Sequence, residues 1–226
     1  MSTELHRIAP WGKSLEEYRR MFALSDEDLE LKLLECGDGS SSFNAEMAAL
    51  GYAVVSIDSV HLLPREQIKE RVAQNYAGVI SRIKRGRDEY RWEYFDDPRE
   101  LRRNRLVTME IFLEDLDRGV AEGRYVREKL PSLSFDEGLF DLALCSHLLF
   151  ANSDRLSSRF HIQLTRELCR VAKEVRIFPL LSFEGRPSPF VADVQSRLAA
   201  QGHRVELVTV PYEFQRFGNQ MMRITK

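Results

Sequence analysis

The sequence predicts an α/β protein with a doubly wound, mostly parallel sheet of seven strands that ends in an antiparallel C-terminal hairpin. First, short apolar runs rich in β-branched residues alternate with helical patterns along the chain. Second, the run at 31–35 leads into the glycine turn Gly37-Asp38-Gly39 and then into a helix, as in α/β nucleotide sites. Third, the last two runs are too close together for a crossover helix, so they should pair antiparallel.

Length and composition limit the class of protein. The 226 residues are enough for one large α/β domain, so we expect the whole chain, 1–226, to form a single domain. A formal net charge of -2 gives no overall attraction to DNA or to an anionic membrane. No apolar run approaches the roughly 20 residues that span a bilayer.

The cysteines and the N-terminus indicate a cytoplasmic protein. There are 3 cysteines, an odd number, and they read as reduced and buried thiols. Residues 1–13 have no apolar core of the kind that a secretory signal requires. No Cys/His pair has metal-ligand spacing, so we expect no metal.

The first part of the chain predicts two helices and two strands. Ser14 and Glu17 form a capping box at the start of the first helix, and Gly51 closes the second. The second strand, Ala-Val-Val-Ser-Ile, is rich in β-branched residues and ends in Asp58. In chain order, the expected ranges are helix 14–22, strand 31–35, helix 42–50 and strand 53–57.

Residues 59–123 separate the second strand from the third. A plain crossover needs roughly 10 to 20 residues, so this segment is several times too long. It predicts two helices, at 64–84 and 98–116, each with a proline in its first turn. An aromatic linker at 90–95 joins them. We expect a two-helix insertion within the single domain.

The remaining patterns complete the sheet. The run at 140–146 is too continuously apolar to be an edge strand. The other expected elements are strands at 124–126, 174–178, 204–210 and 220–224, and helices at 157–171 and 190–200.

The glycine turn and its neighbours predict an adenosine cofactor at the carboxyl ends of the strands. Gly37 and Gly39 let the backbone approach a ligand, and a carboxylate at Asp58 can hold both ribose hydroxyls. A dinucleotide site would need a third small residue where this chain has Ser41. Glu35 would repel a diphosphate, whereas it suits the cationic aminoacyl end of S-adenosylmethionine.

These motifs resemble the class I S-adenosylmethionine-dependent methyltransferases. The resemblance rests on Glu35-Cys36-Gly37-Asp38-Gly39, on Asp58, on the segments at 130–131 and 140–149, and on the closing hairpin. It covers the whole chain except 59–123. Four stretches resemble more narrowly a bacterial set of methyltransferase-like proteins without an assigned substrate: 41–46, 140–150, 171–181 and 211–216.

The resemblance implies a Rossmann-like methyltransferase sheet and a cofactor, S-adenosylmethionine, that leaves as S-adenosylhomocysteine. It implies that Glu35, Gly37 and Gly39 contact the methionine end and Asp58 the ribose, while the loop after the third strand contacts the adenine. Glu128 is the nearest acid for that loop. The full set of cofactor candidates is Glu35, Gly37, Asp38, Gly39, Asp58, Glu128, Leu130, Ser146 and His147.

The sequence says less about the residues that would bind or activate the methyl acceptor. His147 follows the fourth strand directly and is the candidate general base, with a packing or cofactor-contacting histidine as the alternative. Tyr18, Tyr212 and Arg216 are candidates for the substrate pocket; the alternative is that they only pack against other side chains. The basic residues of 82–105 indicate either a solvated helix face or a patch for RNA.

Four functions remain open from the sequence. The first is in-line methyl transfer to a small-molecule acceptor, with the insertion as a lid. The second keeps the reaction but makes the acceptor RNA or protein; the chain lacks the Asn/Asp-Pro-Pro-aromatic motif of enzymes that methylate nucleic-acid amino groups. The third is a non-catalytic module that binds the cofactor or its product. The fourth, a nicotinamide-dependent oxidoreductase, is disfavoured by the glycine pattern. The acceptor and the oligomeric state are not determined by these residues.

Overall fold

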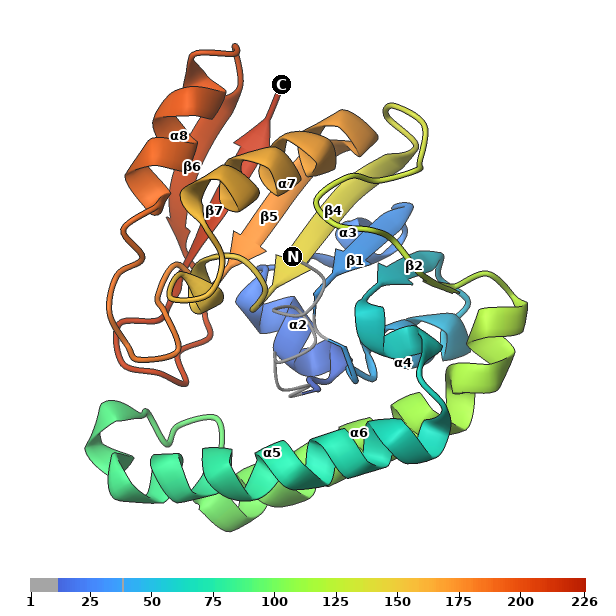
Figure 1. Ribbon diagram of the computed structural model, residues 1–226, viewed down its shortest axis with the longest axis vertical. Helices are drawn as coiled ribbons and strands as arrows, with labels where there is room; N and C mark the ends of the chain where they lie inside the picture. The colour runs from blue at the N-terminus through green and yellow to red at the C-terminus, as the bar shows by residue number, and fades with distance from the viewer. Residues whose placement is uncertain (1–11, 38) are drawn as a thin grey trace.

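A computed structural model describes residues 12–37 and 39–226, and they form a seven-stranded sheet in the order β3-β2-β1-β4-β5-β7-β6 (Figure 1). The first five strands are parallel, and β7 runs antiparallel to both β5 and β6. This confirms the predicted sheet and its antiparallel hairpin. The strands are β1 Leu33–Cys36, β2 Val54–Ile57, β3 Tyr125–Val126, β4 Phe140–Ser146, β5 Ala172–Phe178, β6 Arg204–Thr209 and β7 Gln220–Thr225.

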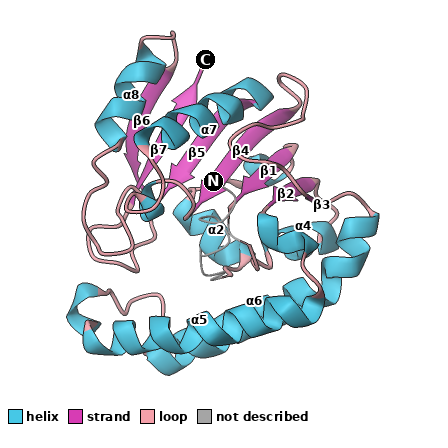
Figure 2. Cartoon of the chain, in the orientation of Figure 1, coloured by secondary structure: helices cyan, strands magenta, loops and turns pink. Residues whose placement is uncertain are grey.

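Helices cover both faces of the sheet (Figure 2). Alternate residues of β4 point to opposite faces. Leu142 and Leu144 pack with residues of α2 and α4, whereas Ala143 and Cys145 pack with residues of α7 and α8. The α-helices are α2 Leu15–Met21, α3 Asp26–Leu29, α4 Phe43–Ala49, α5 Arg65–Arg85, α6 Pro98–Ala121, α7 Ser158–Val171 and α8 Val191–Ala199. Three 3₁₀ turns complete the set: η1 Ser59–Leu62, η2 Arg87–Glu89 and η3 Phe150–Asn152.

Helix ends follow the predicted caps with two differences. Helix α3 was not expected; Ser25 caps it, and its capping box uses Asp28 in place of the usual Glu or Gln. Helix α6 continues past residue 116 to Ala121, because the ion pair between Asp115 and Arg118 supports the added turn.

The segment between β2 and β3 consists mainly of α5 and α6, which lie side by side across the bottom of Figure 1. Near its base, Phe112 and Leu116 of α6 pack with Tyr125 of β3. Near its tip, Tyr90 and Phe95 form a second apolar cluster.

The tip of this segment contacts the loop between β6 and β7. Phe214 of that loop packs against the tip cluster, and its carbonyl accepts a hydrogen bond from the Arg91 amide at 2.8 Å. The Arg216 amide donates to the Glu89 carbonyl at 2.9 Å. Residues 87–95 and 211–219 therefore lie side by side, although they are far apart in the sequence.

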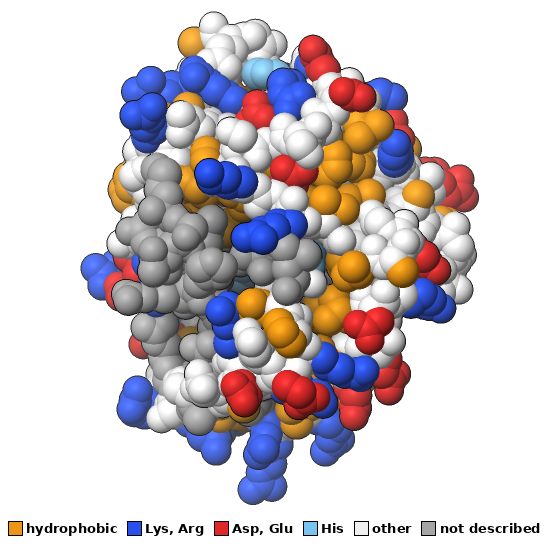
Figure 3. Space-filling model, turned by 45° about the vertical axis from the view of Figure 1, so that its right-hand side comes forward, with side chains coloured by type: hydrophobic (Ala, Val, Ile, Leu, Met, Phe, Trp, Pro, Cys, Tyr) orange, Lys and Arg blue, Asp and Glu red, His pale blue; other side chains and the backbone are white. Residues whose placement is uncertain are grey.

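The surface carries both charges. On the face in Figure 3, acidic and basic side chains are interspersed, as expected at a net charge of -2. Among the helices that the structure describes, none combines the length and the apolar composition that crossing a membrane requires.

Candidate cofactor site

The glycine turn lies where three strands end together. Cys36 pairs with Ile57 of β2 and with Cys145 of β4, so the residues that follow these strands meet at one edge of the sheet. Gly37 has a φ of +98°, and a Cβ there would lie 2.4 Å from the Cβ of Leu148 in the turn after β4. Position 37 therefore needs glycine for its conformation and for its close contact. Asp38 lies outside the described residues.

Glu35 and Tyr18 form a buried pair beneath this turn. The Tyr18 hydroxyl donates a 2.7 Å hydrogen bond to the Glu35 carboxylate, and both residues are buried. The Tyr18 ring stacks on Phe43 of α4 with centroids 4.2 Å apart. Tyr18 thus orients Glu35 from the protein core.

The chain itself occupies the N-terminus of α4. The carbonyl of Lys13 accepts hydrogen bonds from the Ser42 amide at 3.1 Å and from the Ser41 hydroxyl at 2.7 Å. The Ser41 hydroxyl in turn accepts from the Phe43 amide. Ser41 thus stands in the place of a third glycine, and its hydroxyl contacts both Lys13 and the first amide of α4. This polar contact takes up part of the space that a pyrophosphate would need at the start of the helix.

Asp58 follows β2 and orders the next turn. Its Oδ1 accepts from the Val60 amide at 2.8 Å and so caps η1. In the same turn, His61 Nε2 lies 3.0 Å from the carbonyl oxygen of Gly39. Asp58, the glycine turn and η1 thus form one connected group.

His147 stands directly after β4 in a left-handed conformation, with a φ of +52°. Its Nδ1 lies 3.0 Å from the Ser146 hydroxyl, and its amide donates to the Phe178 carbonyl at 2.8 Å. The Asn152 amide donates to the carbonyls of His147 and Leu148 and so holds the turn.

The protonation of His147 is set by its surroundings. Burial lowers the pKa of its imidazole well below the ordinary 6.5, and the positive charges of Lys13 and Arg105 add to this shift. The ring is therefore neutral near pH 7, and the same surroundings disfavour its protonated form.

The two candidates of the β3–β4 loop stay predictions. The Glu128 carboxylate accepts hydrogen bonds from the amide and the hydroxyl of Ser134, which orders its own loop. Leu130 packs against the apolar core on the α7 and α8 side.

Tyr212 and Arg216 fasten the β6–β7 loop. The Tyr212 hydroxyl donates to Glu17 Oε1 at 2.8 Å, and Arg105 Nη2 donates to the same oxygen at 2.6 Å. Burial opposes ionisation of Glu17, but the Arg105 guanidinium outweighs it, so the pKa of this carboxyl is lowered. The Arg216 guanidinium donates to the Asp88 carbonyl.

Sequence reasoning missed four residues of this region: Lys13, Glu17, His61 and Arg105. Glu17 was assigned only to a capping box, and Arg105 to a basic cluster. A signal for Arg105 existed, because Leu101, Arg105 and Phe112 share one helix face, and that face is buried.

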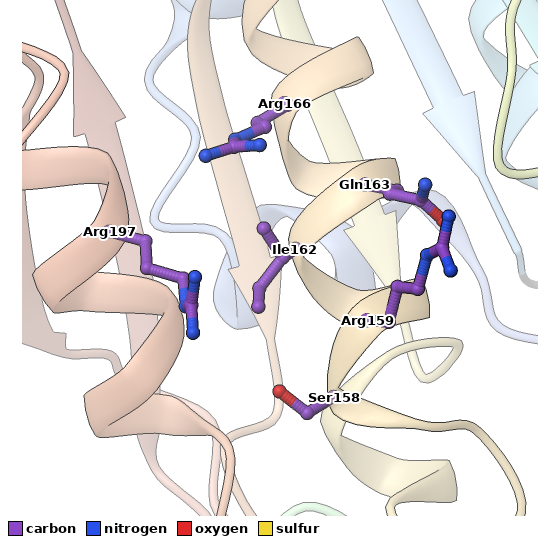
Figure 4. Close-up of a pocket in the computed structure, with 6 residues that line it drawn as sticks. All are labelled: Ser158, Arg159, Ile162, Gln163, Arg166 and Arg197. Atoms are coloured by element: carbon purple, nitrogen blue, oxygen red, sulfur yellow. The ribbon is translucent and has the colours of Figure 1, made fainter.

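Other features lie away from this edge or are absent. A hollow of about 300 Å³ between α7 and α8 is lined by Ser158, Arg159, Ile162, Gln163, Arg166 and Arg197, and Figure 4 shows Arg166 and Arg197 extending into it from opposite sides. None of the predicted site residues lines it. Within the described ranges, no three His, Cys, Asp or Glu side chains gather as a metal site would require.

Solved structures of similar architecture include methyltransferases. A SAM dependent methyltransferase from Aquifex aeolicus is 13% identical, with 99% of this chain and 96% of that one covered and a TM-score of 0.45. Magnesium protoporphyrin IX methyltransferase (ChlM) from Synechocystis PCC 6803 with bound SAH is 13% identical over 98% and 84% of the two chains, with a TM-score of 0.47. Because these scores are below 0.5, we argue the fold from the strand order instead.

No family model matches the chain. A curated protein of Methanocaldococcus jannaschii, described as "Uncharacterized protein MJ0045", is 30% identical to it over 217 residues, which are 95% of each chain. The chain therefore belongs to the same family as the M. jannaschii protein MJ0045.

Proposed function

We propose that the protein is an S-adenosylmethionine-dependent methyltransferase that acts on a small-molecule acceptor. One observation carries this proposal: the glycine turn and Asp58 meet beside an α4 N-terminus that Lys13 already occupies. This arrangement offers groups for an adenosine and for a cationic amino acid, and Lys13 and Ser41 take up part of the helix start that phosphates would use.

The residues present fit that cofactor. The buried carboxylate of Glu35 suits its ammonium group, and the Asp58 carboxylate suits the ribose hydroxyls. Gly37 and Gly39 give the turn its positive-φ backbone, and Leu130 offers an apolar surface for the adenine. When bound, the cofactor would supply a methyl group on a positively charged sulfur.

The chain supplies position and a proton acceptor. Ser146 and His147 end the central strand β4, so they stand next to the glycine turn at the same edge. An acceptor held there would react in line with the sulfur–carbon bond, where orientation supplies most of the acceleration. If the acceptor loses a proton, His147 is the candidate to take it because of its position after β4, although its surroundings make it a weak base.

The segment at 59–123 favours a small acceptor. Its tip is fastened to the β6–β7 loop through Arg91, Phe214 and Arg216, so it covers the carboxyl edge as a lid would. An acceptor of the size of RNA or protein would need this contact to open.

All three cysteines are buried and free, which suits a cytoplasmic protein.

The cofactor assignment is tested by calorimetric titration with S-adenosylmethionine, S-adenosylhomocysteine and NAD. We expect the first two to bind and NAD not to bind; binding of NAD alone would overturn the proposal. Asp58→Ser keeps a side chain that can cap η1 but removes the carboxylate. It should weaken cofactor binding at least about tenfold, near 1.4 kcal/mol. Asp141→Ser, at the opposite end of β4, is the matched control.

Turnover is tested with cofactor that carries a labelled methyl group, incubated with cell-extract fractions and followed by product identification. A labelled small molecule supports the proposal, and labelled RNA or protein moves the acceptor to the second class. Cofactor binding without transfer to any fraction would favour a non-catalytic binding module. His147→Ala should lower kcat and leave the cofactor Kd nearly unchanged if His147 accepts a proton.

A further inference from the structure

His61 is a buried histidine whose place in the fold has consequences beyond packing. Only 4% of its surface is exposed. Its Nε2 lies 3.0 Å from the carbonyl oxygen of Gly39. Because a carbonyl oxygen only accepts hydrogen bonds, Nε2 carries the proton and donates.

The bond that His61 makes holds the more flexible side of the glycine turn. Gly39 has a φ of +52°, a conformation that glycine adopts and leaves easily. The orientation of its carbonyl sets the path of the next residues into α4. Without a donor at this point, the peptide unit after Gly39 would lose the contact that fixes its direction.

The other nitrogen of His61 shows that packing alone does not explain the residue. Nδ1 is buried and makes no hydrogen bond of good geometry among the residues that the structure describes. Burial lowers the pKa of the ring, although the Asp58 carboxylate and the backbone of Gly39 and Ser56 oppose this shift. An apolar side chain would fill the same space without burying an unsatisfied nitrogen. The hydrogen bond to Gly39 is what a histidine adds.

The ring also connects the turn to the segment at 59–123. It lies against Tyr125 of β3 and Phe112 of α6, with centroids 4.9 and 5.8 Å away. Helix α6 carries the lid of the proposed enzyme. His61 therefore touches the glycine turn through its edge and the base of the lid through its ring.

We propose that His61 is a positioning residue that holds the glycine turn in its cofactor-binding geometry and couples that geometry to the base of α6. This inference rests on the proposed function, since the ligand it serves is S-adenosylmethionine. The residue acts through Gly39 and does not need to touch the ligand.

The test compares substitutions that keep or remove the donor. His61→Gln places an amide N–H close to the position of Nε2, whereas His61→Leu fills space without a donor. His61→Asn is polar but too short to reach Gly39, and it serves if the leucine variant does not fold. We measure the Kd for S-adenosylhomocysteine and, without ligand, the hydrogen exchange of peptides that span 36–42 and 108–116.

We expect His61→Leu and His61→Asn to weaken binding at least about tenfold, near 1.4 kcal/mol, and to speed exchange in both peptides. His61→Gln should restore the affinity to within about threefold of the unsubstituted protein. If His61 had only a structural role, His61→Gln would bind S-adenosylhomocysteine as weakly as His61→Leu, and that result would overturn the inference. Unchanged binding by His61→Leu would overturn it too.

A matched control and the exchange data separate this inference from the function. His161 is also buried and has its Nδ1 2.9 Å from the Ser157 carbonyl, but it lies in α7. His161→Leu should lower stability and leave the Kd unchanged. If the unsubstituted protein binds no cofactor, the proposed function fails. The hydrogen exchange of 36–42 still reports whether His61 holds the turn. Unchanged exchange in His61→Leu would refute the role of His61 as well.

Discussion

Helix α6 contributes to two similar clusters, in each of which a carboxylate binds arginine and tyrosine side chains; Asp115 has a second arginine, Arg118, as well. In the first, Arg105 and Tyr212 bind Glu17; this is the Glu17 cluster. In the second, Arg124 and Tyr125 bind Asp115; this is the Asp115 cluster. The members of the Glu17 cluster are 88 and 195 residues apart in sequence, whereas those of the Asp115 cluster are only 9 and 10 apart.

The difference in sequence separation implies a difference in how each cluster can open. The Asp115 cluster closes a short loop, so little chain entropy is released when it breaks. The Glu17 cluster joins α2, α6 and the β6–β7 loop, and it is the more deeply buried: the side chains of Glu17 and Arg105 are 0% and 3% exposed. The Asp115 cluster thus joins neighbouring parts of the chain, whereas the Glu17 cluster holds α6 and the β6–β7 loop to α2.

The largest effect is expected for Glu17→Ala. It leaves the Arg105 guanidinium buried without its carboxylate, which costs about 3–5 kcal/mol of the free energy of unfolding. Urea unfolding followed by circular dichroism measures this. The double variant Glu17→Leu with Arg105→Met should recover most of the loss, and a double variant as unstable as the single one would argue against an orphaned charge as the cause.

Asp115→Ala should cost less, about 2–3 kcal/mol. Arg124 keeps its ion pair with Glu122, and Arg118 is 64% exposed and returns to water. The same unfolding experiment gives the value. A loss larger than that of Glu17→Ala would reverse the comparison and make the Asp115 cluster the dominant contact.

Acid should lower the stability of the fold at pH values at which the carboxylates of both clusters are still ionised. Burial lowers the pKa of His61, His147 and His161 below the ordinary 6.5. As pH falls below 6.5, the unfolded chain binds protons that the folded chain does not, so stability is complete above 6.5 and declines below it. Stability should therefore be lower at pH 5.5 than at pH 6.5. The pKa values of Glu17 and Asp115 are lowered from 4.5 and 3.8, so these carboxylates stay ionised in that range.

Urea unfolding at both pH values checks this decline, and His161→Leu should remove about one third of it. An equal decline in that variant would show that His161 does not titrate as expected.

The smallest effect is expected for Tyr212→Phe. Glu17 keeps both hydrogen bonds from Arg105, so the loss is about 1 kcal/mol. If the Glu17 cluster helps to hold residues 87–95 against 211–219, hydrogen exchange in Tyr212→Phe should rise in peptides of both ranges and stay constant near Asp115. A uniform rise would instead indicate general destabilisation.

The parts that sequence predicted are those that depend on local pattern. The alternating apolar runs, the positive-φ glycine at position 37 and the Pro98 helix start all follow from backbone preferences, and the structure confirms the elements they predict. The antiparallel C-terminal hairpin also follows, because the last two runs are too close together for a crossover helix.

What sequence could not predict depends on partners far along the chain. No residue near Tyr18 in the sequence indicates that its hydroxyl donates to Glu35. The partner of Tyr212 is equally hidden, because Glu17 lies 195 residues away. The basic run around Arg105 looked solvated, yet that one guanidinium turns inward onto a carboxylate that has a second role in a helix cap.

The carbonyl of Lys13 caps α4 from outside the sheet, and this matters for anyone who shortens the chain. Most domains tolerate the loss of a few residues before their first helix. Here the Ser42 amide and the Ser41 hydroxyl would both lose their acceptor, at the point where the glycine turn enters α4. A shortened protein that starts at α2 would keep every strand and still lose the contact that fixes the entry of the chain into α4.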